Sequence, residues 1–390
     1  MKQNLITIAI TILIIALPIA IIPNATLYNL PKIWILAIGG ITLLILLLVN
    51  YKKLKLDNKD YVILAFAVLV FISTMLSSKV KISIIGETNR YEGMIAFYTY
   101  ILIYFCAKKF LKYKNNKTLL NILHAIYIVI SILGILQYYI KLPTNALIPI
   151  FIIIYITKNN KISFCTSLLV FFNLIACQAR SGWIAFAIFS VLMLIYLIKN
   201  KNKEYAKRAL ILLVCFITIF GVIYLPQSSK VRIKIEQVKN DVTVVKTSGI
   251  DDKLGSNRIQ IWKVVIELIE KHPIFGVGTD NLKNGVGENL TETSIDFIQR
   301  AKGIMDKAHN EYLHIAVTIG IPALILYLTF IALVILPNIK KIFKKESIFI
   351  ILSVIISYLA QAFFNISTIG IAPLFWVALG ILDNKNFENI

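Results

Sequence analysis

Residues 306–314 place side chains that could transfer a proton at the edge of a long apolar segment. The stretch "DKAHNEYLH" holds His309 and Asn310 directly before that segment, with Tyr312 and His314 a few positions later. A neutral imidazole accepts a proton near neutral pH, so His309 is a candidate general base, and the other three are candidate supporting residues. The plainer interpretation is that His309 is only the polar end of one more helix.

Three arginines stand next to other apolar segments and could bind an anion. Arg90 lies in "GETNRYEGM", Arg180 in "CQARSGW" and Arg258 in "GSNRIQIW". The planar guanidinium group binds phosphate through paired donors. Anchoring of a helix end by a long cationic side chain is the ordinary alternative for each of them. Arg180 is the strongest candidate, because its turn between two apolar segments is very short.

The composition identifies the kind of protein in which these residues act. Hydrophobic residues make up 58% of the 390 positions and charged residues only 16%. The apolar residues come in repeated long blocks, and about 20 such residues span a bilayer. The net charge of +21 is then explained by Lys and Arg in cytoplasmic loops, so we expect membrane lipids and no nucleic acid as partners.

The apolar blocks predict an all-α membrane protein with about 12 transmembrane helices. These lie near residues 4–22, 33–49, 61–77, 94–107, 118–140, 145–157, 163–178, 183–198, 209–225, 311–336, 348–366 and 370–382. The short loops between these segments form two alternating sets. The loops of one set contain twenty Lys or Arg residues in total, and the loops of the other set contain six. This bias predicts that both termini are cytoplasmic in a multi-pass protein.

Three regions follow from this topology. Residues 1–225 form the first nine transmembrane helices, and residues 310–390 form the last helices and the cytoplasmic C-terminus. Residues 226–309 form one large external loop with an amphipathic helix at about 257–271, which would lie on the membrane or against the bundle. No element is assigned to 226–255. Gly320 and Pro322 predict a kink in the tenth span.

This topology gathers Arg90, Arg180, Arg258 and His309 on the external face. Positive charge is disfavoured in short external loops, so arginines held there need an anionic partner, such as a lipid-linked phosphate. "GVGTDN" at 276–281 is only a weak phosphate-loop signal, because it lacks the lysine and the strand-turn-helix context. The sequence has no cluster with metal-ligand spacing, so we expect no metal and no cofactor.

The sequence resembles the O-antigen ligase and O-antigen polymerase family of bacterial multi-spanning membrane glycosyltransferases. The resemblance rests on "ARSGW", "NRIQIWKVVIELIEKHPIFGVGTDNL", "HNEYLHIAVTIGIPALILYL" and, more weakly, "NRYEGM". It implies a glycosyltransferase C-type architecture in the inner membrane of the cell. His309 would match the histidine that activates the acceptor hydroxyl. Arg180 and Arg258, and more weakly Arg90, would match the arginines that hold the diphosphate.

The resemblance implies metal-independent, inverting transfer of a glycan from an undecaprenyl-diphosphate carrier to a glycan, lipid or protein acceptor. Lipopolysaccharide assembly by an O-antigen ligase is one such reaction. A repeat-unit polymerase of polysaccharide biosynthesis and a protein O-oligosaccharyltransferase would use the same residues. A transporter or flippase of lipid-linked glycans is the alternative of another class. We expect few charged residues inside the spans, which favours chemistry at the surface over passage through the membrane.

Overall fold

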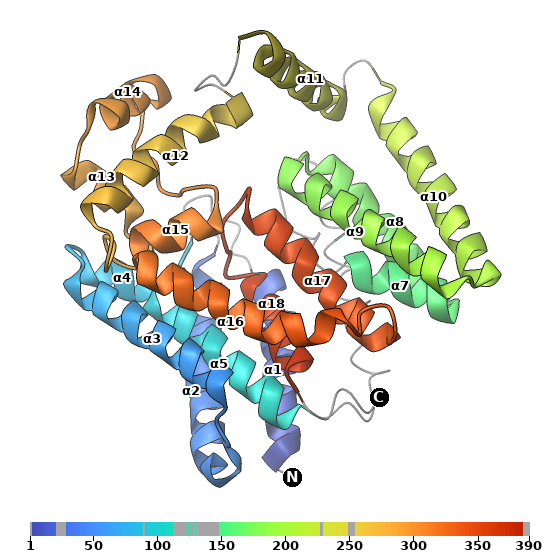
Figure 1. The fold of residues 1–390 in the computed structure, drawn as a ribbon, viewed down its shortest axis with the longest axis horizontal. Coiled ribbons are helices and arrows are strands. Elements are labelled where there is room, and N and C mark those ends of the chain that lie inside the picture. Colours follow the sequence, from blue (N-terminus) through green and yellow to red (C-terminus); the bar gives the residue numbers. More distant parts are fainter. Residues whose placement is uncertain are drawn as a thin grey trace. The chain divides into compact units, whose positions relative to one another are not determined.

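The computed structural model describes most of the chain as helix and divides it into two compact units. The described residues are 2–20, 29–88, 90–111, 124, 128, 131, 148–226, 229–248 and 254–384. Every regular element among them is helical (Figure 1), as predicted. Unit 1 comprises Met1–Tyr113, Asp252–Asn338 and Ala362–Ile390, and unit 2 comprises Lys114–Asp251 and Ile339–Gln361.

Unit 1 is a helical bundle with α5 at its centre. Its helices are α1 (Lys2–Ile19), α2 (Leu30–Val49), η1 (Tyr51–Lys53), α3 (Asn58–Leu76), α4 (Val80–Ile85), α5 (Met94–Phe110), α12 (Leu254–Lys271), α13 (Leu282–Glu288), α14 (Glu292–Ala301), α15 (Glu311–Thr318), α16 (Ile321–Ile339) and α18 (Ala372–Leu382). Helix α5 packs against α1, α2, α3 and α18. It is buried on most sides, which explains why it is apolar all round.

Aromatic rings join three of these helices. Tyr104 on α5 meets Phe330 on α16 edge to face, with ring centroids 4.8 Å apart. Trp376 on α18 stacks on Tyr100 and Phe330, each at about 6 Å. Such pairs are stabilising beyond the area they bury. They fix α16, which follows the segment carrying His309, against the bundle.

Helices α12 to α15 form a second core within unit 1. The apolar face of α12 buries Ile261, Val265 and Leu268 against Val286 of α13 and Phe297 of α14. Helix α12 ends at Lys271, directly before His272 and Pro273, because a residue that precedes proline is disfavoured in the helical conformation. The amphipathic helix predicted at 257–271 therefore packs on its own neighbours, and its buried face is not available to a membrane surface.

The predicted tenth span, 311–336, is wrong as one continuous helix. The helix is interrupted at Gly320, which has φ +111° and separates α15 from α16. The amide of Ile321 donates to the carbonyl of Pro273 at 2.8 Å, so the break is held by the segment that follows α12. The kink predicted at Gly320 and Pro322 is thus a full interruption of the helix. Of the two resulting helices, α16 is long and apolar enough to cross a membrane, and α15 is not among the candidate spans.

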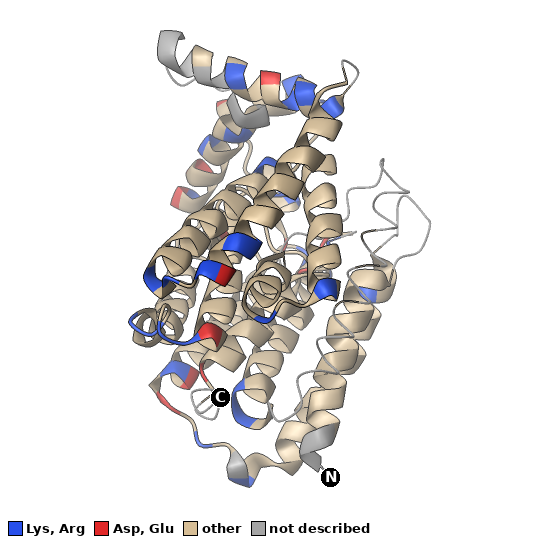
Figure 2. Cartoon of the chain, turned by 90° about the vertical axis from the view of Figure 1, so that its right-hand side faces the viewer, with Lys and Arg blue, Asp and Glu red and all other residues tan. Residues whose placement is uncertain are grey.

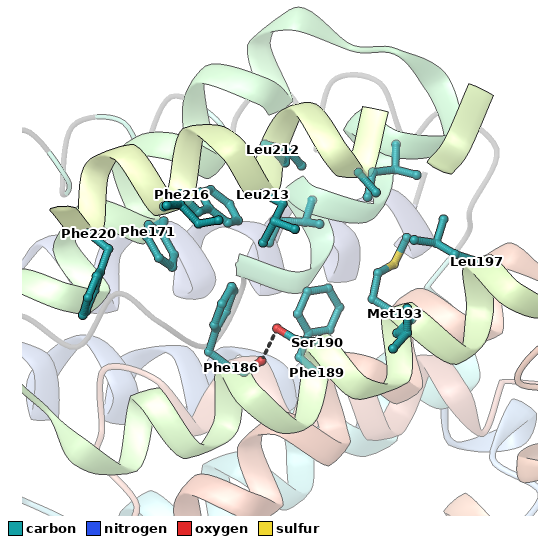
Figure 3. Close-up of a pocket in the computed structure, with 15 residues that line it drawn as sticks. Phe171, Phe186, Phe189, Ser190, Met193, Leu197, Leu212, Leu213, Phe216 and Phe220 are labelled. Atoms are coloured by element: carbon teal, nitrogen blue, oxygen red, sulfur yellow. Dashed lines mark hydrogen bonds between the residues drawn. The ribbon is translucent and has the colours of Figure 1, made fainter. Parts of the chain in front are cut away.

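Unit 2 contains the six remaining described helices. They are α7 (Ile148–Lys158), α8 (Lys161–Ala176), α9 (Arg180–Asn200), α10 (Lys203–Tyr224), α11 (Lys230–Ser248) and α17 (Glu346–Ala362). No element was assigned to 226–255 from the sequence, and α11 occupies much of that stretch. A cavity of about 380 Å³ lies among α7, α8, α9 and α10 (Figure 3). Its one polar lining side chain, Ser190, donates its hydroxyl to the carbonyl of Phe186 at 2.8 Å.

Five described helices are long and apolar enough to span a membrane. They are α2, α3, α9, α10 and α16, and shorter apolar helices accompany them. These helices show a multi-pass membrane protein. The predicted count of 12 goes beyond this finding, and most of the predicted span 118–140 lies outside the described residues.

Candidate functional site

His309 lies in the loop between α14 and α15, in an unusual backbone conformation. Its φ is +51°, the left-handed region that side chains other than glycine, asparagine and aspartate rarely adopt. The residue is half-buried. Such a conformation persists only where the surroundings fix it, and it is common at functional sites.

Two donors from other elements fix this loop by its carbonyl groups. Arg90 donates through Nη1 to the carbonyl of Asp306, and Nε1 of Trp262 on α12 donates to the carbonyl of Ala308 at 2.9 Å. Asn310 then caps α15, since its Oδ1 accepts from the amide of Leu313 at 3.1 Å. His309 therefore lies between a loop segment whose carbonyl groups are fixed and the capped start of α15.

Arg90 also forms a buried ion pair with Asp280. The Asp280 side chain is fully buried and that of Arg90 is 10% exposed. Asp280 Oδ2 accepts from the amides of Glu87 at 2.7 Å and Glu92 at 3.3 Å, so the loop around Arg90 is organised by the same carboxylate. His314 Nε2 lies 3.5 Å from Arg90 Nη2 and 3.6 Å from Asp280 Oδ1. The structure thus brings together Arg90 and His314 around Asp280.

The "GVGTDN" segment positions Asp280 by packing against the break between α15 and α16. The amide of Val277 donates to the carbonyl of Val317, and that of Gly278 to the carbonyl of Thr318, each at 3.0 Å. Gly276 and Gly278 both have positive φ, and a Cβ on either would overlap neighbouring atoms. These glycines allow close contact between chain segments. Their amides are used within the protein, which agrees with the weak phosphate-loop signal of the sequence.

The electrostatic surroundings keep the His309 imidazole neutral. The pKa of His309 is lowered to about 4, first by burial and then by the cationic side chains of Lys307 and Arg258, against the opposing effect of Asp306. Burial disfavours the imidazolium, and like charges nearby do the same. At neutral pH this side chain can accept a proton and cannot donate one from a charged form.

The remaining predicted residues take different places. Arg258 lies in the first part of α12, half-buried, close enough to His309 to affect its pKa. The ring centroids of Tyr312 and Phe363 lie 6.4 Å apart, and Phe363 also packs edge to face with Trp262. Arg180 is the first residue of α9 in unit 2. Unit 1 therefore carries Arg90, Arg258, His309, Asn310, Tyr312 and His314, and unit 2 carries Arg180.

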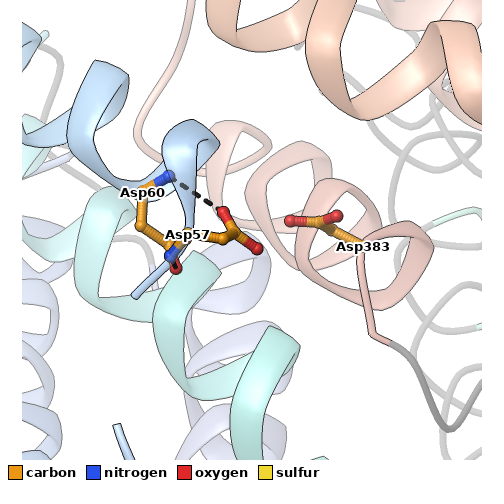
Figure 4. A group of neighbouring side chains, drawn as sticks. All are labelled: Asp57, Asp60 and Asp383. Atoms are coloured by element: carbon orange, nitrogen blue, oxygen red, sulfur yellow. Dashed lines mark hydrogen bonds between the residues drawn. The ribbon is translucent and has the colours of Figure 1, made fainter. Parts of the chain in front are cut away.

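A second ionic group of unit 1 lies near the start of α3. The carboxylates of Asp57, Asp60 and Asp383 lie close together (Figure 4). Lys108 Nζ sits among them at 2.6–2.7 Å from all three, so an ammonium group occupies the place that a metal ion would need. Tyr104 donates to Asp383 at 2.7 Å. We interpret the group as a structural network that joins α3, α5 and α18.

The two ionic groups of unit 1 lie at opposite ends of α3. Asp60 is in the first turn of α3, whereas Thr74 near its end lies 2.9 Å from Thr279, the neighbour of Asp280. Fourteen residues of α-helix correspond to about 21 Å. Buried Asp60 and Lys108 lie just outside the predicted spans 61–77 and 94–107. Helix α3 begins about three residues before its predicted span and α5 ends about three residues after its own, so the two helices include Asp60 and Lys108.

Two residues of the site have weak sequence signals. Asp280 follows a glycine-rich turn that indicates only tight packing, and its partner Arg90 is 190 positions away in the chain. Trp262 lies within the predicted amphipathic helix at 257–271, and its indole N–H holds the loop of His309. Both roles depend on contacts between segments that are distant in the sequence, so the local sequence around each residue could not indicate them.

Comparison with known proteins gives a match to a protein-family model. The family model described as O-antigen ligase matches residues 165–328. This range contains Arg180, Arg258, Asp280 and His309 and parts of both units, whereas Arg90 precedes it. No curated protein matches the chain.

Proposed function

Because the O-antigen ligase family model matches residues 165–328, we propose that the chain transfers a glycan from an undecaprenyl-diphosphate carrier to an acceptor hydroxyl. Members of this family are glycosyltransferase-like enzymes, ligases and polymerases. The observation that carries the proposal is His309, a neutral and half-buried imidazole in an anchored loop beside Arg258. A histidine that acts as a general base must be neutral before it can accept the proton of a hydroxyl.

The proposed reaction is a single displacement at the anomeric carbon. His309 accepts the proton of the acceptor hydroxyl as the hydroxyl oxygen forms a bond to that carbon. The bond from the carbon to the diphosphate oxygen breaks, and the diphosphate leaves with its electron pair. The configuration at the carbon is inverted. Positive groups that face the leaving oxygen stabilise the developing negative charge and lower the barrier.

Arg258 is the proposed ligand of the diphosphate in unit 1, and the role predicted for Arg180 from the sequence is tested separately. Arg258 has the position to act with His309, since its charge already affects that imidazole. Arg90 was predicted for the same role, but its guanidinium is engaged with Asp280 and the Asp306 carbonyl. Its contacts support a positioning role, in which it holds the loop that carries His309. His314 and Asn310 support the same loop from α15.

A polymerase and a protein O-oligosaccharyltransferase remain variants of this proposal, because they would use the same base and the same leaving group. The proposed place of the reaction is the external face of the cytoplasmic membrane, with both termini in the cytoplasm. The two ionic groups lie at opposite ends of α3, and only the group with Arg90 and Asp280 is connected to the loop of His309. This supports a reaction at that end of unit 1. A flippase would need polar groups along a path between the two ends.

The test is transfer by the purified chain in proteoliposomes. Vesicles that contain an undecaprenyl-diphosphate-linked glycan are mixed with acceptors of three kinds, namely a second lipid-linked glycan, a lipid A core and a protein. Release of undecaprenyl diphosphate with formation of a longer or attached glycan supports the proposal, and the productive acceptor identifies the variant. Movement of the lipid-linked glycan between leaflets without release of the diphosphate would instead indicate a flippase.

A further inference from the structure

Helix α11 begins a few residues after a membrane-spanning helix ends. The span α10 ends at Tyr224, and α11 starts at Lys230. Ser229 fixes the bend, since its hydroxyl donates to the carbonyl of Ile223 at 2.6 Å and its amide to that of Pro226 at 3.0 Å. Six residues of extended chain reach at most about 20 Å. The start of α11 is therefore confined to the neighbourhood of the membrane surface.

The side chains of α11 are sorted around the helix. Val231, Ile235 and Val238 recur at spacings of four and three residues and so share one face. Val231 is fully buried, and Ile235 and Val238 are half-buried. Helix α11 is in contact with α10, so this apolar face begins next to a membrane-spanning helix.

Cationic side chains flank this apolar face on both sides. By helical spacing, Lys230 and Lys234 lie along one edge, and Arg232 and Lys239 along the other. Glu236 is the one carboxylate among residues 230–240. Arg232 lies 6.0 Å from the ring centre of Tyr224, the last residue of α10, and 3.3 Å from Glu236. Figure 2 shows α11 at the top of the view, crossing the end of α10, with its Lys and Arg residues in blue.

We propose that α11 is an interfacial helix that binds the anionic phosphate headgroups of the membrane lipids at the end of α10. An apolar face bordered by Lys and Arg lets the helix lie in the interface, with its cations reaching the phosphates. Over the whole of α11, five Lys or Arg residues against two carboxylates give the net positive charge that complements an anionic surface. The short connection to α10 places this surface within reach. This role goes beyond the proposed glycan transfer and does not depend on it.

The test is hydrogen exchange of the full chain in nanodiscs of two compositions. One set contains phosphatidylcholine only, and the other contains phosphatidylcholine with phosphatidylglycerol. We expect the backbone amides of α11 to exchange about tenfold more slowly in the anionic discs. The difference should fall as salt rises, because salt screens surface charges. In K234Q, and separately in K239Q, it should fall about fivefold.

A matched variant separates this role from a general effect of charge. Lys340 and Lys341 lie in another basic segment of unit 2, and the K340Q/K341Q variant should keep the full protection of α11. Equal exchange in both kinds of disc, or protection that persists in K234Q and K239Q, would overturn the proposal. Protection produced by a soluble polyanion such as heparin, and not by phosphatidylglycerol, would also overturn it and identify α11 as a polyanion site.

Discussion

Arg90 and Asp280 form a buried ion pair between the loop before α5 and the loop before α13. The same guanidinium donates to the carbonyl of Asp306, three positions before His309. One arginine thereby links an internal counter-charge to the loop that holds the proposed base. The consequence is that the position of His309 depends on a residue that need not touch the substrate.

The D280N variant should lose much of the stability of unit 1. The amide side chain leaves the Arg90 charge buried without a counter-charge, and removal of one partner of a buried pair costs about 3–5 kcal/mol. The measurement is the free energy of unfolding in mixed micelles.

The control is E236Q, which breaks the Arg232–Glu236 pair on α11. Both side chains there are well exposed, at 39% and 54%. Solvent screens such a pair, so its loss should cost less than about 1 kcal/mol. Similar losses in D280N and E236Q would contradict the role given to the buried pair.

Gly320 should not tolerate a side chain. A Cβ there would overlap the carbonyl of Ile274, and the φ of +111° is strained for any other residue. We expect G320A to lose at least about 1–3 kcal/mol from backbone strain alone. In the same region, a Cβ on Gly303 meets no atom within 4 Å. G303A should therefore unfold at nearly the same temperature as the unaltered chain, and equal losses in both variants would show that the break before α16 is not constrained.

The sequence was sufficient for much of the fold, because the signals involved are local. Long apolar blocks predict most of the helices, and the amphipathic pattern at about 257–271 predicts α12 and its end before His272 and Pro273. The interruption at Gly320 was predicted only as a kink. Its extent depends on Pro273, which accepts a hydrogen bond from Ile321 across about fifty residues of chain.

The sequence was less informative about the site. His309 stood out because it is a histidine at the edge of a long apolar segment. Its left-handed backbone and its neutral state could not be predicted, because they arise from burial and from Trp262, Arg90 and Lys307 nearby. The ion pair of Arg90 also gives this residue a different proposed role from the one that its type and position suggested.

The dependence of transfer on pH should report the His309 pKa. His309 must be neutral to accept a proton, and its pKa in the free protein is about 4. The value of kcat/KM should therefore hold as pH falls from 7 and decline only as pH approaches 4. A bound diphosphate favours the imidazolium, so the decline of kcat should begin at a higher pH than that of kcat/KM.

The K307Q variant should move this decline upward in pH. Lys307 is the cation that lowers the pKa of His309 most, after burial, and its removal makes protonation easier. K302Q is the matched control, because Lys302 is an exposed lysine of the same loop. A decline near pH 6.5 in the unaltered chain, or no difference between K307Q and K302Q, would contradict the assigned surroundings of His309.

Arg258 and Arg180 should not be replaceable by lysine. Lysine keeps the charge but lacks the planar pair of donors that a diphosphate engages. We expect R258K and R180K each to reduce transfer about tenfold or more, corresponding to the loss of one or two charge-assisted hydrogen bonds. R300K, on the exposed outer part of α14, should transfer normally. Full activity in R258K and R180K would mean that charge alone suffices or that these arginines do not bind the donor.

The most direct test of the central claim is glycan transfer by the H309N variant in proteoliposomes. Asparagine accepts the left-handed backbone of this position but cannot act as a base at neutral pH. The account predicts that H309N inserts, unfolds at the same temperature and binds the lipid-linked donor, while transfer falls at least a hundredfold. Transfer at the rate of the unaltered chain would show that His309 is not the base.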